Sequence, residues 1–180
     1  MKEFRIHGRG GQGAVTTAEL LALAAIAQGK YAQAFPSFGP ERRGAPVMAF
    51  ARISDEPIRI RSRVQEPDVV VVLDQSLLEL VPVEEGLKEK GAVVANASGE
   101  PKSFLGRLKP GQRFYFVDAN SIAAEVLGRP ITNTTMIGAL LKATGVVELK
   151  SLEGPVRDRF GRLADRNLEA MKRAYDSLKV

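Results

Sequence analysis

The stretch FRIHGRGGQGAVTTAELLALAAIAQG, residues 4–29, decides the fold class of this 180-residue chain. Phe4 to His7 predicts a short strand, and residues 14–28 predict a helix that Gly29 ends as a C-cap. The loop between them reads Gly8-Arg9-Gly10-Gly11-Gln12-Gly13. A strand followed at once by such a glycine-rich loop and a helix is typical of the first unit of a Rossmann-like α/β domain.

The predicted helix is apolar on nearly every side. Leucine, isoleucine, valine and alanine fill most of residues 14–27 and leave no continuous polar face. A helix of this kind must be covered on more than one side. We therefore expect it to be covered either by its own domain or by a partner.

Short apolar runs alternate with helix-forming stretches along the rest of the chain. We expect strands at residues 31–35, 47–53, 58–63, 69–73, 92–95 and 114–117, and helices at 77–90, 122–127, 135–144, 152–160 and 161–179. The strands at 47–53 and 58–63 flank a turn at residues 55–57 and predict an antiparallel hairpin. The pattern predicts a three-layer α/β/α fold with a mostly parallel sheet, a Rossmann-like start, this hairpin and C-terminal helices. Residues 1–180 are expected to form a single domain.

The composition excludes several kinds of chemistry. The chain has no cysteine and a single histidine, His7. Disulfides, thiolate catalysis, cysteine-ligated iron–sulfur clusters and multi-histidine metal centres are therefore excluded on this chain. No acidic cluster suggests a carboxylate-held metal, so no metal site is expected.

Charge and hydropathy point to a cytoplasmic protein that binds neither membranes nor nucleic acids. The longest apolar run, residues 20–27, is far shorter than the roughly 20 residues that span a bilayer, and no secretory signal follows Met1. The net charge is +5, but the cations are interleaved with 21 acidic residues and tryptophan is absent. An acidic partner protein or a phosphorylated cofactor fits this balance better than nucleic acid.

The glycine-rich loop is a candidate anion site. Gly8, Gly10 and Gly13 satisfy G-x-G-x-x-G, so that backbone N–H groups and a helix N-terminus can approach a phosphate, with Arg9 beside them. The acid that would bind an NAD ribose is absent after the next strand, where the first acid is Glu41. An NAD site is disfavoured. The remaining interpretations are a plain tight turn, a site for another phosphate or pyrophosphate, and a contact with another subunit.

A second candidate is the loop at residues 37–46, rich in glycine and proline. Arg42 or Arg43 can grip a phosphate or carboxylate, or either arginine can pair with Glu41 inside the loop. Arg59, Arg61 and Arg63 lie on one face of the predicted hairpin. They form either a solvated surface or an electropositive patch for an acidic partner or coenzyme phosphates.

Polar residues follow three of the predicted buried strands. Asp74, Asn96 and Asp118 stand where ligands bind in parallel sheets, and each also suits a helix cap. We expect at least two of them to be caps. His7 lies beside the glycine-rich loop, but one histidine without a nucleophile or acid partner makes no mechanism.

Taken together, these motifs resemble the gamma subunit, or gamma domain, of the 2-oxoacid:ferredoxin oxidoreductases. The resemblance covers nearly the whole chain and is closest to the pyruvate:ferredoxin oxidoreductase (pyruvate synthase) gamma subunit. Gly44-Ala45-Pro46 is similar to the branch that acts on pyruvate and branched-chain oxoacids. The motifs that carry it are residues 8–14, 31–36, 38–46, 67–74 and 133–140.

The resemblance implies a non-catalytic subunit of an enzyme that decarboxylates a 2-oxoacid oxidatively to acyl-CoA and reduces ferredoxin. Thiamine diphosphate and iron–sulfur clusters are then expected on alpha, beta and delta (ferredoxin-like) partner subunits, with no cofactor on this chain. Coenzyme A is the co-substrate of the complex. The residues that the resemblance offers for coenzyme or partner contact are Gly8, Arg9, Gly10, Gly11, Gln12, Gly13, Glu41, Arg42 and Arg43.

Three alternatives stay open from the residues alone. One is a stand-alone nucleotide or coenzyme A binding protein, which would be monodisperse without partners. Another is a free-standing Rossmann-type oxidoreductase, which the absent ribose-binding acid disfavours. The third is a 2-oxoisovalerate, indolepyruvate or 2-oxoglutarate version of the same multi-subunit enzyme.

Overall fold

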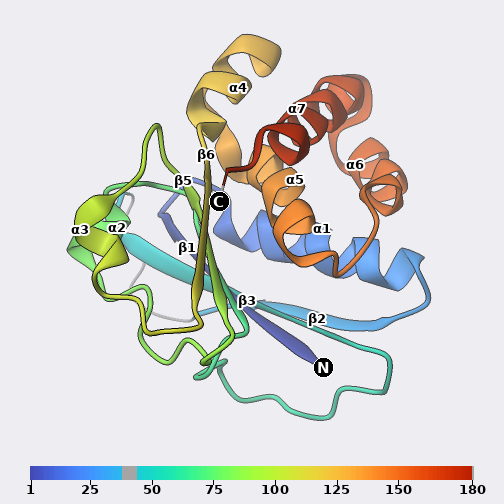
Figure 1. Ribbon diagram of the computed structural model, residues 1–180. Coiled ribbons are helices and arrows are strands. Elements are labelled where there is room, and N and C mark those ends of the chain that lie inside the picture. The colour runs from blue at the N-terminus through green and yellow to red at the C-terminus, as the bar shows by residue number, and fades with distance from the viewer. Residues whose placement is uncertain (38–43, 180) are drawn as a thin grey trace.

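A computed structural model describes residues 1–37 and 44–179 of the chain (Figure 1). The strands are β1 (Lys2–Arg9), β2 (Tyr31–Pro36), β3 (Pro46–Ser54), β4 (Val69–Val72), β5 (Ala92–Asn96) and β6 (Arg113–Val117). The α-helices are α1 (Ala14–Ala27), α2 (Leu77–Leu80), α3 (Lys102–Leu105), α4 (Ala119–Leu127), α5 (Thr132–Thr144), α6 (Glu153–Phe160) and α7 (Ala164–Ser177). Two 3₁₀ helices, η1 (Leu149–Leu152) and η2 (Gly161–Leu163), precede α6 and α7.

The strands form one mixed sheet in the order β2-β3-β1-β4-β5-β6. β1, β4, β5 and β6 are parallel, whereas β3 runs antiparallel to both β1 and β2. The carboxyl ends of β1 and the three parallel strands beside it therefore meet at one edge of the sheet. The predicted α/β class with a mostly parallel sheet is confirmed.

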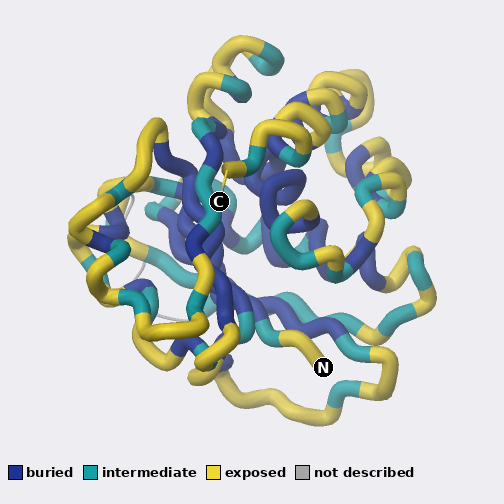
Figure 2. Tube along the Cα trace, in the orientation of Figure 1, coloured by how far each residue is buried: buried dark blue, intermediate teal, exposed yellow. Residues whose placement is uncertain are grey.

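One face of the sheet carries the larger core. Helices α1, α5 and α7 lie on this face (Figure 1), and much of the backbone between them and the sheet belongs to buried residues (Figure 2). Apolar residues of β1, β3 and β4 pack there against these helices. Helix α1 lies between the sheet and the helices α5 and α6, so its own domain covers most of it. Its side chains Leu23 and Ile26 are exceptions, with 44% and 53% of their surface exposed.

The other face is covered by short elements rather than by a full helical layer. Over β4, β5 and β6, a second core of buried residues includes Leu77, Leu78, Val83 and Phe104. Over β1 and β3, two buried arginines take the place of helices. Arg5 donates to the carbonyl oxygens of Val83 and Glu85.

Arg52 is the second buried arginine on this face. Its side chain is 1% exposed, pairs with Glu3 at 2.8 Å and stacks on the ring of Phe35. It also donates to the carbonyl oxygens of Ile60 and Ser62. A buried guanidinium is tolerated because these partners satisfy its charge and its donors.

The expected strand at residues 58–63 is wrong, and Arg52 explains why. The carbonyl oxygens of Ile60 and Ser62 accept from Arg52, and that of Ile58 accepts from Gln33. Side chains thus take the bonds that a neighbouring strand would make. The antiparallel hairpin instead joins β2 to β3.

The expected helix at residues 77–90 is also wrong beyond its first turn. Helix α2 ends at Leu80, and Val81 is extended ahead of Pro82, because a residue before proline avoids helical geometry. The carbonyl oxygen of Leu78 accepts a hydrogen bond from Arg107 at 2.6 Å in place of a further helical bond. Helix α3 is short and went unpredicted.

The C-terminal helices follow the expected order. Helix α7 packs along α5 in its own domain, with Ala164, Asn167, Ala170, Met171 and Ala174 buried. Leu168 and Tyr175 flank this buried stripe and are only half-buried. In the described part of the chain, no helix is both long and apolar enough to cross a membrane.

Candidate functional site

The glycine-rich loop (residues 8–13) begins within the last residues of β1 and ends at Gly13, directly before α1. Gly11 and Gly13 have φ of +92° and +81°, which side chains rarely adopt. Gly13 is the N-cap of α1, and a Cβ there would lie 2.5 Å from Asn133 Nδ2. Among the residues described, the N–H groups of Gly11 and Gly13 have no partner. The loop therefore presents free backbone donors beside a helix N-terminus.

Side chains hold this loop to the end of β4. The Gln12 amide donates to Asp74 Oδ2 at 2.7 Å and accepts from the Arg9 backbone N–H at 2.8 Å. The Arg9 guanidinium lies 3.3 Å from Asp74 Oδ2 and donates to Ser76 Oγ. Arg9 is thus an internal brace, and its charge is largely neutralised by Asp74.

Asp74 is a charged anchor. Its burial opposes ionisation, but hydrogen bonds from Ser76 and Gln12 and the nearby Arg9 charge outweigh that effect and lower its pKa. Both carboxylate oxygens are occupied by these donors. Asp74 therefore shapes the loop.

The same loop is hydrogen-bonded to the end of the second candidate motif. Gly10 N–H donates to Ala45 O at 2.8 Å, Gly44 N–H donates to Gly10 O at 3.2 Å, and Arg9 donates to Gly44 O. Two motifs about 30 residues apart in the sequence therefore lie side by side at the carboxyl edge of the sheet. Glu41, Arg42 and Arg43 lie outside the described residues.

A pocket of about 250 Å³ opens beside the loop. It lies between the carboxyl ends of β1 and β4, from which the chain continues to α1 on one face and α2 on the other. This is the topological switch point, where ligands bind in α/β sheets. Its walls include Gly11, Gln12, Asp74, Asn96, Asn120 and Thr132. The N-terminal ends of α1, α4 and α5 contribute to these walls, which favours an anionic group.

Of the three polar residues after the buried strands, only Asp118 caps the helix that follows it, so the expectation of at least two caps is wrong. Asp118 accepts from the Ser121 N–H and caps α4. Asn96 accepts from the Ala119 N–H and donates to the carbonyl oxygen of Leu73. Asn96 is 2% exposed, so it ties β4 to α4 beneath the pocket.

His7 is unsuited to act as a base. Burial, and then the charge of Arg5, lower its pKa to about 3. Its Nε2 accepts from Arg5 Nε at 3.0 Å. His7 is therefore neutral and structural.

The sheet order gives a reason for the absent ribose-binding acid. In a dinucleotide-binding fold, that acid stands at the carboxyl end of the strand that follows the first helix and lies parallel beside the first strand. Here the strand in this position is β3, which is antiparallel and has its first residue, Pro46, opposite Arg9. The carboxyl end of β3 lies at the far edge of the sheet, so an NAD-type site has no strand end to carry its acid.

Sequence reasoning missed Asn120 and Thr132 as pocket residues. Thr132 is 6% exposed and begins a polar run, residues 132–135, at the start of an otherwise apolar helix. Four successive polar residues ahead of an apolar stretch were the available signal in the sequence. The Oδ1 atom of Asn133 and the Oγ1 atom of Thr135 have no partner within the described residues.

Other candidate features lie elsewhere. A larger hollow of about 550 Å³ lies at the opposite edge, lined by Met1 and residues 54–60. It contains Arg59 with Asp55 and Glu56 but neither sequence motif, so we favour the smaller pocket as the functional one. No group of three or more potential metal ligands occurs in residues 1–37 and 44–179.

The fold and the site define a Rossmann-like α/β domain with a phosphate-type loop at the switch point of its sheet. A family model described as pyruvate ferredoxin/flavodoxin oxidoreductase matches residues 3–177. The chain belongs to this family.

Relatives match over the whole chain. The Pyrococcus furiosus protein named pyruvate/ketoisovalerate oxidoreductases common subunit gamma is 53% identical over 182 residues, covering 100% of this chain and 98% of the relative. Pyruvate synthase subunit PorC of Methanothermobacter marburgensis is 53% identical over 180 residues, covering 99% and 98%. The chain is therefore a gamma-type subunit of a 2-oxoacid:ferredoxin oxidoreductase, as predicted.

Solved structures agree with the fold. The pyruvate oxidoreductase subunit PORC of Thermotoga maritima has a TM-score of 0.88 at 40% identity, covering 99% of this chain and 97% of that one. The 2-oxoglutarate:ferredoxin oxidoreductase of Magnetococcus marinus, with 2-oxoglutarate, coenzyme A and succinyl-CoA bound, has a TM-score of 0.80 at 22% identity. This chain covers 30% of that protein, and the likeness shows the fold alone.

Proposed function

We propose that this chain serves a pyruvate:ferredoxin oxidoreductase as a single-domain gamma subunit whose carboxyl edge contacts coenzyme A. The observation that carries the proposal is the hydrogen-bonded junction of Gly10 with Gly44 and Ala45. It joins the two motifs on which the family resemblance rests, beside a pocket bordered by helix N-termini.

The chemistry of coenzyme A fits this edge. Its phosphates need backbone donors and cations, which the glycine-rich loop and the arginine pair Arg42/Arg43 supply. Glu41 and the residues from Gly8 to Gly13 complete the proposed contact set. Because Arg9 is paired with Asp74, we assign it to holding the loop and the arginine pair to the phosphates.

The remaining parts of the enzyme belong to its partners. We propose alpha, beta and delta subunits that carry thiamine diphosphate and iron–sulfur clusters, ferredoxin as the electron acceptor, and a cytoplasmic location. The names of the relatives from Pyrococcus and Methanothermobacter support pyruvate as the oxoacid, and ketoisovalerate is the second candidate because the Pyrococcus name includes it.

The test is kinetic and uses the native complex purified anaerobically through a tag on this chain. The double variant Arg42→Gln/Arg43→Gln is expected to raise the KM for coenzyme A at least about tenfold, because each charge-assisted phosphate bond contributes roughly 1.5–3 kcal/mol. The KM for pyruvate should stay unchanged. Arg59→Gln/Arg61→Gln is the matched control, because these arginines lie at the opposite edge of the sheet.

Two outcomes would overturn parts of the proposal. Unchanged coenzyme A kinetics in the arginine variant would assign the loop to subunit contact alone. Purification of this chain as a solitary protein would remove the subunit role and favour a stand-alone nucleotide or coenzyme A binding protein.

A further inference from the structure

The two outermost strands of the sheet, β6 and β2, differ in their pairing. At one edge, β6 is paired with the C-terminal segment, since Phe116 and Lys179 exchange two backbone hydrogen bonds of 2.9 and 3.0 Å. At the other side of the sheet, the outermost strand β2 pairs only with β3 within the residues that the structure describes. An open strand edge is a template for pairing with another chain.

The open backbone groups of β2 are identified by its register. Ser37 N–H donates to Met48 O at 2.9 Å, so odd-numbered residues of β2 exchange hydrogen bonds with β3. The even-numbered residues, Ala32 and Ala34, therefore direct their N–H and C=O groups outward. Nothing in residues 1–37 or 44–179 pairs with these groups.

The side chains of β2 lack the usual protection of an edge. Exposed edge strands generally carry lysine or other charges that prevent pairing. The strand reads Tyr-Ala-Gln-Ala-Phe-Pro and has no charged residue, although the chain as a whole carries +5. Only Pro36 limits the edge, because it removes the next outward N–H after Ala34.

The strand is complementary to a second copy of itself. In an antiparallel arrangement centred on Gln33, Ala32 of each copy faces Ala34 of the other. Each of these two pairs exchanges two backbone hydrogen bonds, four in all. The same register sets Tyr31 opposite Phe35 of the other copy, twice. Aromatic cross-strand pairs stabilise sheets.

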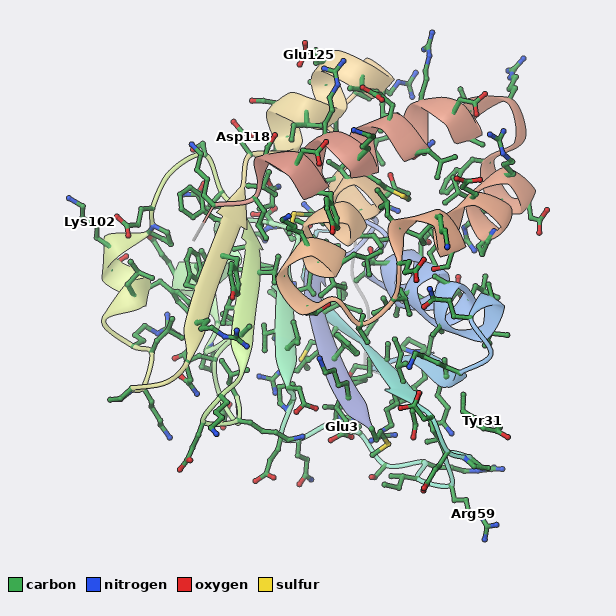
Figure 3. The ribbon with its side chains drawn as sticks, turned by 45° about the vertical axis from the view of Figure 1, so that its right-hand side comes forward. Glu3, Tyr31, Arg59, Lys102, Asp118 and Glu125 are labelled. Carbon is green, nitrogen blue, oxygen red and sulfur yellow. The ribbon has the colours of Figure 1, made fainter. Side chains whose placement is uncertain are left out.

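Tyr31 is otherwise unexplained in the single chain. It is 49% exposed and projects away from the body of the protein (Figure 3). Phe35 lies on the same face of β2, where it packs against Phe50 at 5.3 Å. A second copy would continue this aromatic row across the junction. No charged side chains would face each other across this strand pair.

We propose that β2 pairs with β2 of a second copy of this chain, with Gln33 on the two-fold axis. The two sheets then join into one, and the complete enzyme contains linked pairs of this subunit. The contact is isologous, as closed two-fold interfaces are. It is independent of the coenzyme A proposal, which concerns the carboxyl edge.

Cross-linking tests the register directly, because the chain has no cysteine. Gln33→Cys introduces one thiol at a non-hydrogen-bonded position opposite itself, where strand Cα atoms lie about 4.5 Å apart, within disulfide reach. Mild oxidation should give a covalent homodimer, in the purified chain and in the native complex. Tyr31→Cys, on the same face and two residues away, should not cross-link to itself, but should cross-link to Phe35→Cys when the two are mixed.

A second variant tests the hydrogen bonds. Ala34→Pro removes an outward N–H that β3 does not use, so the fold should keep its thermal unfolding temperature. It deletes two of the four bonds and should raise the dimer dissociation constant at least about tenfold in analytical ultracentrifugation. The proposal is overturned if the native chain sediments as a monomer, or if Gln33→Cys cross-links no better than Tyr31→Cys. Cross-linking of Gln33→Cys to a different subunit of the complex would also overturn it.

Discussion

Gly13 is the position in the glycine-rich loop where a side chain is least tolerated. Its φ is +81°, and a Cβ would lie 2.5 Å from Asn133 Nδ2 on α5. We expect Gly13→Ala to lower the free energy of unfolding by about 2–4 kcal/mol, from left-handed strain and overpacking together. Gly11→Ala is the control, because Gly11 shares the strain at φ +92° but has open space around it. Urea unfolding should show the smaller loss, about 1–2 kcal/mol, in the control; equal losses would show that contact with α5 is unimportant.

The buried His7 gives stability a pH dependence. Its pKa is about 3 in the folded protein, against an ordinary 6.5, so between these values the unfolded state binds more protons. Protonation then favours unfolding, and His7 should cost about 1.4 kcal/mol of stability per pH unit below pH 6.5.

His7→Gln retains an acceptor for Arg5 and cannot titrate in this range. Between about pH 7.5 and pH 5, urea unfolding should show a loss roughly 2 kcal/mol larger in the native chain than in the variant. Parallel pH profiles would show that the imidazole is not held neutral.

At the scale of elements, α5 and α7 cross at Gly138. A Cβ at this position would lie 1.8 Å from the carbonyl oxygen of Met171. Gly138→Ala should therefore force the helices apart and destabilise the protein by about 1–3 kcal/mol, or more. Gly154→Ala on α6 is the matched control. Its Cβ would meet nothing within 4 Å, so helix propensity predicts a gain of up to about 1 kcal/mol in thermal or urea unfolding.

Elements were predictable where local pattern and tertiary pairing agree. The valine run of β4 and the apolar helix after Gly13 have these positions because burial on both sides leaves few alternatives. The alternation at residues 58–63 failed as a strand signal because Arg52 and Gln33 take its carbonyl bonds. The stretch at 77–90 failed because Pro82 ends α2 after one turn. The hydrogen bonds from Arg52 and Gln33 cannot be seen in the local sequence around residues 58–63.

At the scale of the whole molecule, the candidate site was only half predictable. The glycine-rich loop and Asp74 follow strands, so their meeting at the carboxyl edge follows from a parallel sheet. Asn120 and Thr132 reach the same pocket through the packing of α4 and α5, which no spacing in the sequence reveals. The bond between Gly10 and Ala45 depends on β3 running antiparallel beside β1, which the expected hairpin had placed elsewhere.

The asymmetry of the two faces makes a final prediction about the whole fold. Over β1 and β3, Arg52 replaces a helical layer by binding Glu3 and the segment at residues 58–62. Arg52→Met would leave Glu3 without its close partner and buried carbonyls unsatisfied, so we expect a loss of about 3–5 kcal/mol. Hydrogen exchange should also accelerate across residues 55–66, while α5 keeps its protection.

Arg157→Met is the control for charge removal alone, because its pair with Asp165 is exposed on both sides. It should change stability by less than about 1 kcal/mol and leave exchange at residues 55–66 unaltered. If Arg52→Met behaved like this control, apolar contacts, such as those of the buried Val64, would have to hold the segment at 55–66. Arg52 would then not be required for the position of that segment. Faster exchange confined to 55–66 would instead show that one side chain on β3 secures a segment that has no helix or strand of its own.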